Sequence, residues 1–101
     1  MKIIWKRAAV QSLLKLDLWR LENEWAPISS VLVETIETYF TNQDLSIFVP
    51  GRVVSIKSLP VDMRMVLISL GKSEPYKVFY RQKGTNIEVY LIRHPRQKSI
   101  L

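Results

Sequence analysis

Residues 76–98, with the sequence YKVFYRQKGTNIEVYLIRHPRQK, predict a β-hairpin near the end of the chain. Two runs rich in Val, Ile, Tyr and Phe flank the segment Lys83-Gly84-Thr85-Asn86, as in two strands joined by a turn. A two-residue loop places Gly84 at the first central position, where a type II′ turn requires the positive φ that glycine adopts freely. Lys83 would then face Asn86, which sets the pairing of both strands.

This register divides the hairpin into two faces. One face is apolar and is expected in the core: Val78 opposite Leu91, and Tyr80 opposite Val89. The other face mixes aromatic, apolar and charged side chains: Arg81 opposite Glu88, Phe79 opposite Tyr90, and Lys77 opposite Ile92. A mixed surface of this kind suits a half-open face that a partner covers.

Upstream of the hairpin, the first half of the chain predicts a short strand over Lys2 to Trp5 and then a helix. The helix begins at about Arg7 and is marked by apolar residues spaced four, four, three and four apart: Val10, Leu14, Leu18, Leu21 and Trp25. A second group widens this apolar face and suggests packing on more than one side: Leu13, Leu16 and Trp19. The helix should end at Ala26-Pro27, because the residue before a proline avoids the α region.

A second helix is expected from Ser29 or Ser30, either of which could cap it, to about Thr41. Its buried face would consist of Leu32, Ile36, Tyr39 and Phe40. The Val, Thr and Ile content would also permit a strand, but the alternation that a half-buried strand needs is missing. The two helices would form an antiparallel hairpin around Pro27.

The segment from Asn42 to Asp62 carries turn signals at Pro50-Gly51 and at Pro60, and we assign it no firm structure. Within it, Arg52 to Ile56 is expected to be a short strand or an extended connection, and Met63 to Leu70 follows as a firmer strand. The chain is therefore predicted to be α+β. An N-terminal strand and an α-helical hairpin would pack on a small, mainly antiparallel sheet, in a single domain over residues 1–101.

Composition narrows the classes of function. The 101 residues include no cysteine and one histidine, which leaves few ligands for a metal, and we expect neither a metal nor a cofactor. Because the apolar run near the N-terminus is far shorter than a signal peptide or a membrane span, we expect a cytoplasmic protein that does not bind membranes.

Positive charge is concentrated in the second half of the chain. Residues 51–101 contain ten Lys and Arg against three Asp and Glu, whereas residues 1–50 contain five against six. Clustered cations attract acidic or polyanionic partners. An ordinary solvated surface would show the same imbalance, so charge alone leaves both interpretations open.

Four segments together carry a family resemblance: PGR at Pro50–Arg52, a strand that starts at Arg64, PYKVFYR at Pro75–Arg81, and IRHPRQ at Ile92–Gln97. Over essentially the whole chain, this pattern resembles the RelE/ParE toxin superfamily. The resemblance implies the toxin of a bacterial type II toxin-antitoxin pair, with an antiparallel sheet cradled by two helices. It also implies a cognate antitoxin whose disordered segment folds along the toxin.

The superfamily has two functional branches. RelE-like members are ribosome-dependent mRNA endonucleases, and the residues here that match their pattern are Lys77, Arg96 and His94 as a general acid/base. Gln97 stands where those members have a catalytic arginine, and the sequence ends at Leu101 before the place of their tyrosine. The expected function is therefore ParE-like poisoning of DNA gyrase without chemistry, so no residue is assigned as catalytic.

Two alternatives remain open: a RelE-like mRNA interferase that acts on the ribosome, and a basic nucleic-acid-binding module or inactive toxin that only binds antitoxin. Neither reading involves a small-molecule substrate. The candidates for contact with gyrase, nucleic acid or antitoxin are basic residues of the second half: Arg93, Arg96, Lys98, Arg81, Lys77, Arg64 and Lys57. About half of them could instead be solvated charges or, like Arg81, cross-strand partners.

Overall fold

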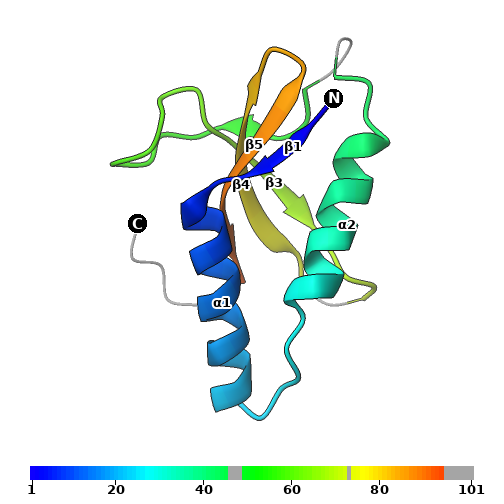
Figure 1. Ribbon diagram of the computed structural model, residues 1–101, viewed down its shortest axis with the longest axis vertical. Helices are drawn as coiled ribbons and strands as arrows, with labels where there is room; N and C mark the ends of the chain where they lie inside the picture. The colour runs from blue at the N-terminus through cyan, green and yellow to red at the C-terminus, as the bar shows by residue number, and fades with distance from the viewer. Residues whose placement is uncertain (46–48, 73, 95–101) are drawn as a thin grey trace.

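The computed structural model describes residues 1–45, 49–72 and 74–94 and shows an α+β fold (Figure 1). The elements in chain order are β1 (Ile3–Trp5), α1 (Arg7–Glu22), α2 (Ser29–Thr41), β2 (Arg52–Val53), β3 (Arg64–Ile68), β4 (Tyr76–Lys83) and β5 (Asn86–Arg93). The strands form one sheet in the order β1-β5-β4-β3-β2, in which β1 runs parallel to β5 and the other neighbours are antiparallel. The predicted fold class and mainly antiparallel sheet are confirmed.

The two helices run antiparallel to each other and cover one face of the sheet (Figure 1). Their buried side chains join those of β3, β4 and β5 in one cluster that includes Leu16, Ile36 and Phe40. At its centre, the rings of Phe40 and Tyr80 lie 4.6 Å apart in an edge-on arrangement. The predicted inner face of the second helix is confirmed, since Leu32, Ile36 and Phe40 are fully buried and Tyr39 packs against the cluster.

The hairpin turn is confirmed, but the register beyond it is only half right. Lys83 pairs with Asn86 across Gly84, whose φ is +61°, and the predicted pairs Arg81–Glu88 and Tyr80–Val89 are present. A β-bulge then inserts one residue into β5, so that Phe79 faces Leu91. The remaining predicted pairs are wrong: Val78 faces Ile92, not Leu91, and Lys77 faces Arg93, not Ile92. A bulge shifts every pair beyond it by one residue, and no glycine lies in this part of β5 to signal it.

The predicted apolar face of the first helix is confirmed in part, because Leu13 and Leu16 are buried and Trp19 packs against the core. Ala9, Leu13 and Leu16 are its buried residues, whereas the regularly spaced apolar stripe lies exposed on the outside: Val10, Leu14, Leu18 and Leu21. The helix carries two apolar faces, and spacing alone cannot tell which of them meets the sheet. Alanine at position 9 allows the helix to approach the sheet closely, which a larger side chain would prevent.

The helix ends and caps differ from those expected. Helix α1 ends at Glu22 rather than at Ala26-Pro27, because Glu24 adopts a left-handed φ of 62° and the Trp25 N–H donates to the Arg20 carbonyl at 2.8 Å. This pattern is a Schellman ending. No serine side chain caps α2. Asp17 on α1 does so instead, since its Oδ1 accepts from the N–H groups of Ile28 at 2.9 Å and Ser29 at 3.1 Å.

In the described part of the segment between α2 and β3, the one strand is the two-residue β2, so Arg52 to Ile56 is mostly an extended connection. The later part of this segment lies against the sheet face that the helices leave uncovered. Met63, Met65 and Phe79 are buried there, outside the main cluster, and Asp62 reaches Arg81 on β4 at 3.5 Å. Among the described residues, this second layer covers part of the helix-free face and leaves Lys77 exposed at the other end.

Candidate functional site

The helix-free face of the sheet carries three of the basic residues that the sequence singled out. On β4, Val78 and Tyr80 point into the core beneath the helices, so Lys77 and Arg81 project to the opposite face. Arg93 lies on that face as well, because directly paired residues of neighbouring strands share a face and Arg93 pairs with Lys77. We call the surface formed by Lys77, Arg81, Arg93 and Lys6 the basic face.

Lys77 and Arg93 lie directly opposite each other only because of the β-bulge. Without the bulge, Lys77 would face the apolar Ile92, as the sequence register predicts. The inserted residue moves Arg93 into that position. Like charges placed directly opposite each other on adjacent strands destabilise a sheet. Bulges are found next to functional sites, where they re-aim a side chain, and this one brings two cations together.

Neither cation is neutralised within the described part of the chain, where no carboxylate lies within ion-pair distance of Lys77 or Arg93. Lys77 is exposed, and Arg93 is half-buried. The Nε atom of Arg93 is buried and has no hydrogen-bond partner among these residues. A buried donor without a partner costs free energy, so the pair is poised to accept an anionic group.

The other two members of the basic face form ion pairs with Glu88. The Nε of Arg81 donates to Glu88 Oε1 at 3.0 Å, and Lys6 Nζ lies 3.8 Å from Oε2. The Tyr90 hydroxyl donates to the same carboxylate at 3.2 Å. The hydrogen bond from Arg81 is the main reason that the pKa of Glu88 lies below its usual value, and burial raises the pKa of Tyr90. Arg81 therefore acts mainly as the cross-strand partner that the sequence register predicts.

Positive charge continues around the edge of the sheet. Strand β1 pairs with β5 only as far as Val89, so the last residues of β5 have α1 as their neighbour on that side. A hollow of about 200 Å³ lies between them and is lined by Ala8, Gln11, Ser12, Lys15, Leu91, Ile92 and Arg93. The hydroxyl of Ser12 accepts from the Ile92 N–H at 3.1 Å. Lys15 thus adds a third cation beside Arg93.

The remaining target-binding candidates do not join this surface. Arg64 pairs with Tyr80, so it lies on the helix side of the sheet, where its Nη1 donates to the Gly51 carbonyl at 3.3 Å. Lys57 lies exposed in the segment between β2 and β3. Arg96 and Lys98 fall outside the described residues. Sequence reasoning missed Lys6 and Lys15 as parts of the site, since only the parallel pairing of β1 and the packing of α1 bring them there. The sequence register does predict Glu88 and Tyr90 on the mixed face of the hairpin.

His94 does not face the cations that were matched to an endonuclease. Its side chain is 8% exposed, and its ring centroid lies 5.1 Å from those of Trp19 on α1 and Tyr76 on β4. Tyr76 belongs to the core beneath the helices, whereas Lys77, the next residue, projects to the opposite face. His94 and Lys77 are therefore on opposite sides of the sheet, and Arg96, the third residue of that set, lies outside the described residues.

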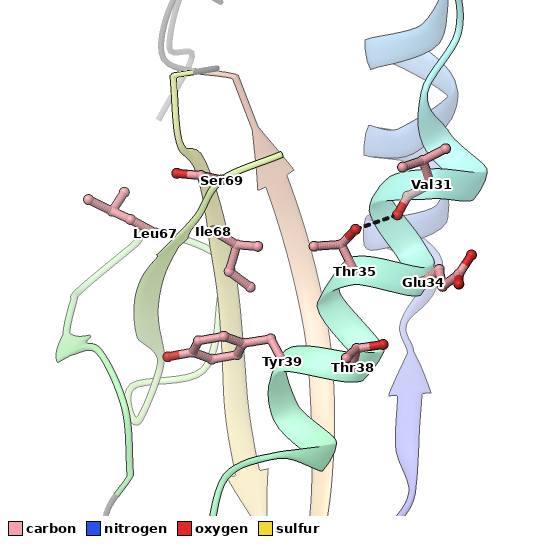
Figure 2. A pocket seen from close by; sticks show the side chains of 8 residues that line it. All are labelled: Val31, Glu34, Thr35, Thr38, Tyr39, Leu67, Ile68 and Ser69. Atoms are coloured by element: carbon pink, nitrogen blue, oxygen red, sulfur yellow. Dashed lines mark hydrogen bonds between the residues drawn. The ribbon is translucent and has the colours of Figure 1, made fainter. Parts of the chain in front are cut away.

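A second hollow, between α2 and β3, has a different chemistry (Figure 2). Its volume is about 590 Å³, and it is lined by Val31, Glu34, Thr35, Thr38, Tyr39, Leu67, Ile68 and Ser69. In Figure 2, Thr35 and Tyr39 project from α2 toward β3, and the Thr35 hydroxyl donates to the Val31 carbonyl at 2.8 Å. The described lining contains a carboxylate and no cation, so this groove lacks the groups that would hold a phosphate.

Within residues 1–45, 49–72 and 74–94, no three acidic or histidine side chains come together as a metal site. In the same residues, neither helix has the length and apolar character needed to span a bilayer. Comparison with family models, with curated proteins and with solved structures finds no match to this chain. The basic face is therefore described from its own geometry, as a cationic surface with a buried, satisfied carboxylate beside it.

Proposed function

We propose that this protein is the toxin of a bacterial type II toxin-antitoxin pair, and that it inhibits growth in the cytoplasm by poisoning DNA gyrase. The arrangement of a helical hairpin over a mainly antiparallel sheet is consistent with this proposal, because the RelE/ParE resemblance in the sequence implies that architecture. In this proposal a cognate antitoxin neutralises the protein, and the basic face contacts the gyrase-DNA complex.

One observation carries the proposal: Lys77 and Arg93 stand side by side, with no counter-charge among the described residues, on the face that His94 does not reach. A cationic surface attracts DNA phosphates or an acidic protein surface and raises the rate of encounter. General acid/base catalysis requires a titrating group within hydrogen-bond reach of the reacting proton. Glu88 is a poor base, because its carboxylate is held in the charged form by Arg81 and Lys6.

An mRNA interferase is the second candidate, and the same pair of cations favours it. Lys77 and Arg93 could stabilise the negative charge that develops on a phosphate during RNA cleavage. This candidate needs a proton donor and acceptor on the basic face. Tyr90 lies beside Lys6 and Arg81 on that face, but burial raises its pKa and its hydroxyl is engaged with Glu88. An inactive homologue that only binds antitoxin is the third candidate.

Pulse labelling of bacteria after induced expression without the antitoxin distinguishes the three candidates. We expect thymidine incorporation to fall before methionine incorporation, and purified gyrase to accumulate cleaved DNA when the protein is added. Methionine incorporation falling first would favour the interferase. Folded protein that affects neither would favour the inactive homologue. The variant Arg93→Glu, expressed to the same level, should lose the inhibition of thymidine incorporation.

A further inference from the structure

The outer face of α1 is apolar and uncovered. Val10, Leu14, Leu18 and Leu21 lie on one line of the helix surface and are between 45% and 61% exposed. Contiguous exposed apolar residues of this kind mark interaction sites in soluble proteins. The stripe is separate from the basic face, since α1 covers the opposite face of the sheet.

The stripe is accessible along its whole length. Helix α1 runs along one side of the molecule, and no other element lies outside it in the described part of the chain (Figure 1). Beside the stripe, a hollow of about 380 Å³ opens between the two helices and is lined by Val10, Leu13, Leu14, Ser29, Ser30 and Val33. A helix laid along α1 could therefore bury the stripe and enter this hollow.

The spacing of the stripe is nearly the same when it is read in either direction. In an antiparallel pair of α1 helices with Leu14 of one copy opposite Leu18 of the other, Val10 would lie within one residue of Leu21. We propose that two copies of this chain associate through an antiparallel pair of α1 helices. Antiparallel packing also aligns the two helix dipoles favourably.

The charges at the two ends of α1 support this arrangement. The first turn of α1 contains Arg7 and no acidic residue, so the positive end of the helix dipole has no compensating charge from its own turn. Glu22 ends the helix and is exposed. In the antiparallel pair, Arg7 of each copy approaches Glu22 of the other on the same flank. The two symmetry-related ion pairs fix the direction of the association.

The expected interface is small. Specific protein interfaces bury at least about 1,200 Å² in total, and one pair of helices with four aliphatic side chains each lies near this lower limit. The dimer should therefore form reversibly at micromolar concentrations. The inference does not rest on the proposed toxin activity, which a monomer could perform.

Sedimentation velocity of the purified full chain over a range from below one micromolar to several hundred micromolar tests the proposal. We expect a monomer-dimer equilibrium. Leu14→Glu with Leu18→Glu should weaken it by at least about a hundredfold, because the variant places charges at the centre of the interface. Val61→Glu, which adds the same charge at an exposed valine outside α1, should leave it unchanged. A monomer at every concentration would overturn the proposal.

A charge exchange tests the antiparallel register. Arg7→Glu or Glu22→Arg alone should weaken the dimer by roughly tenfold, and the two changes together should restore it. Both substitutions match the dipole of α1 better than the native residues do, so the fold should be retained. A double variant no better than the singles would overturn the antiparallel pairing. Circular dichroism tests whether each variant is folded. If the variant with both Leu14→Glu and Leu18→Glu unfolds, Leu18→Glu alone takes its place.

Discussion

Lys77 on β4 and Arg93 on β5 are directly opposite each other on the helix-free face, and a β-bulge brings them there. The pairing costs free energy twice, through repulsion between like charges and through the buried Nε of Arg93, which has no hydrogen-bond partner among the described residues. Such a loss of stability is tolerated at sites that bind a ligand. We therefore expect the Lys77–Arg93 pair to lower the free energy of unfolding and to contribute to binding.

Replacing Lys77 by Met should stabilise the protein and weaken its activity. The substitution removes the repulsion and keeps the aliphatic part of the side chain, so the free energy of unfolding should rise by about 0.2–1 kcal/mol. Growth inhibition should decrease because half of the cation pair is lost. Urea unfolding and a growth assay at matched expression measure the two effects.

Lys72→Met is the matched control, since Lys72 is exposed in the turn before β4. It should change neither stability nor growth inhibition. If Lys77→Met lowered the stability, or stabilised the protein without any loss of activity, the trade-off between Lys77 and Arg93 would be wrong.

His94→Ala should reduce stability without abolishing growth inhibition. The histidine ring fills the space between Trp19 and Tyr76, so its removal should cost about 1–3 kcal/mol of unfolding free energy. The basic face on the other side of the sheet should be unaffected. Thermal unfolding gives the first quantity, and growth inhibition normalised to the amount of soluble protein gives the second.

An endonuclease that used His94 in proton transfer would behave differently. In that case the folded His94→Ala variant would lose its inhibition entirely, even below its unfolding temperature. This outcome would favour the mRNA interferase over the gyrase poison. It would also require His94 to leave its contacts with Trp19 and Tyr76 during the reaction.

Turn residues and local patterns were enough to predict where the helices and strands lie. Which of their faces are buried, and which residues pair, depends on contacts between segments far apart in the sequence. Gly84 and the flanking β-branched residues were enough to locate the hairpin turn, and α2 begins and ends where expected. The bulge at Tyr90 has no local signal, so the facing of Lys77 and Arg93 could not be foreseen. Helix α1 has two apolar faces. The face that contains Ala9 packs on the sheet, because its small side chain permits close contact.

Glu88 should make stability depend on pH in the acid range. Arg81, Tyr90 and Lys6 favour its charged form, so the pKa in the folded state lies below the usual value of 4.5. A depressed pKa contributes stability that is complete above pH 4.5 and is lost as the pH falls through the folded-state value. Glu88→Gln should therefore be less stable than the native protein at neutral pH, and the gap should narrow below pH 4.5. Urea unfolding at several pH values measures this difference in stability. A difference that stayed constant with pH would contradict the lowered pKa of Glu88.

Gly51→Ala should destabilise the fold far more than Gly71→Ala, although both glycines have a positive φ. At Gly51, with φ +86°, a Cβ would lie 2.4 Å from the carbonyl oxygen of Met65, which is backbone and cannot move aside. At Gly71, with φ +60°, a Cβ would meet nothing within 4 Å. The conformational cost of about 1–2 kcal/mol applies to both, and only Gly51 adds the clash. The neighbouring Pro50 carbonyl accepts a hydrogen bond from the buried Tyr80, which ties this turn to the core. We expect Gly51→Ala to lower the melting temperature by more than twice as much as Gly71→Ala. Equal losses would mean that the chain at Gly51 can move away from β3 at little cost.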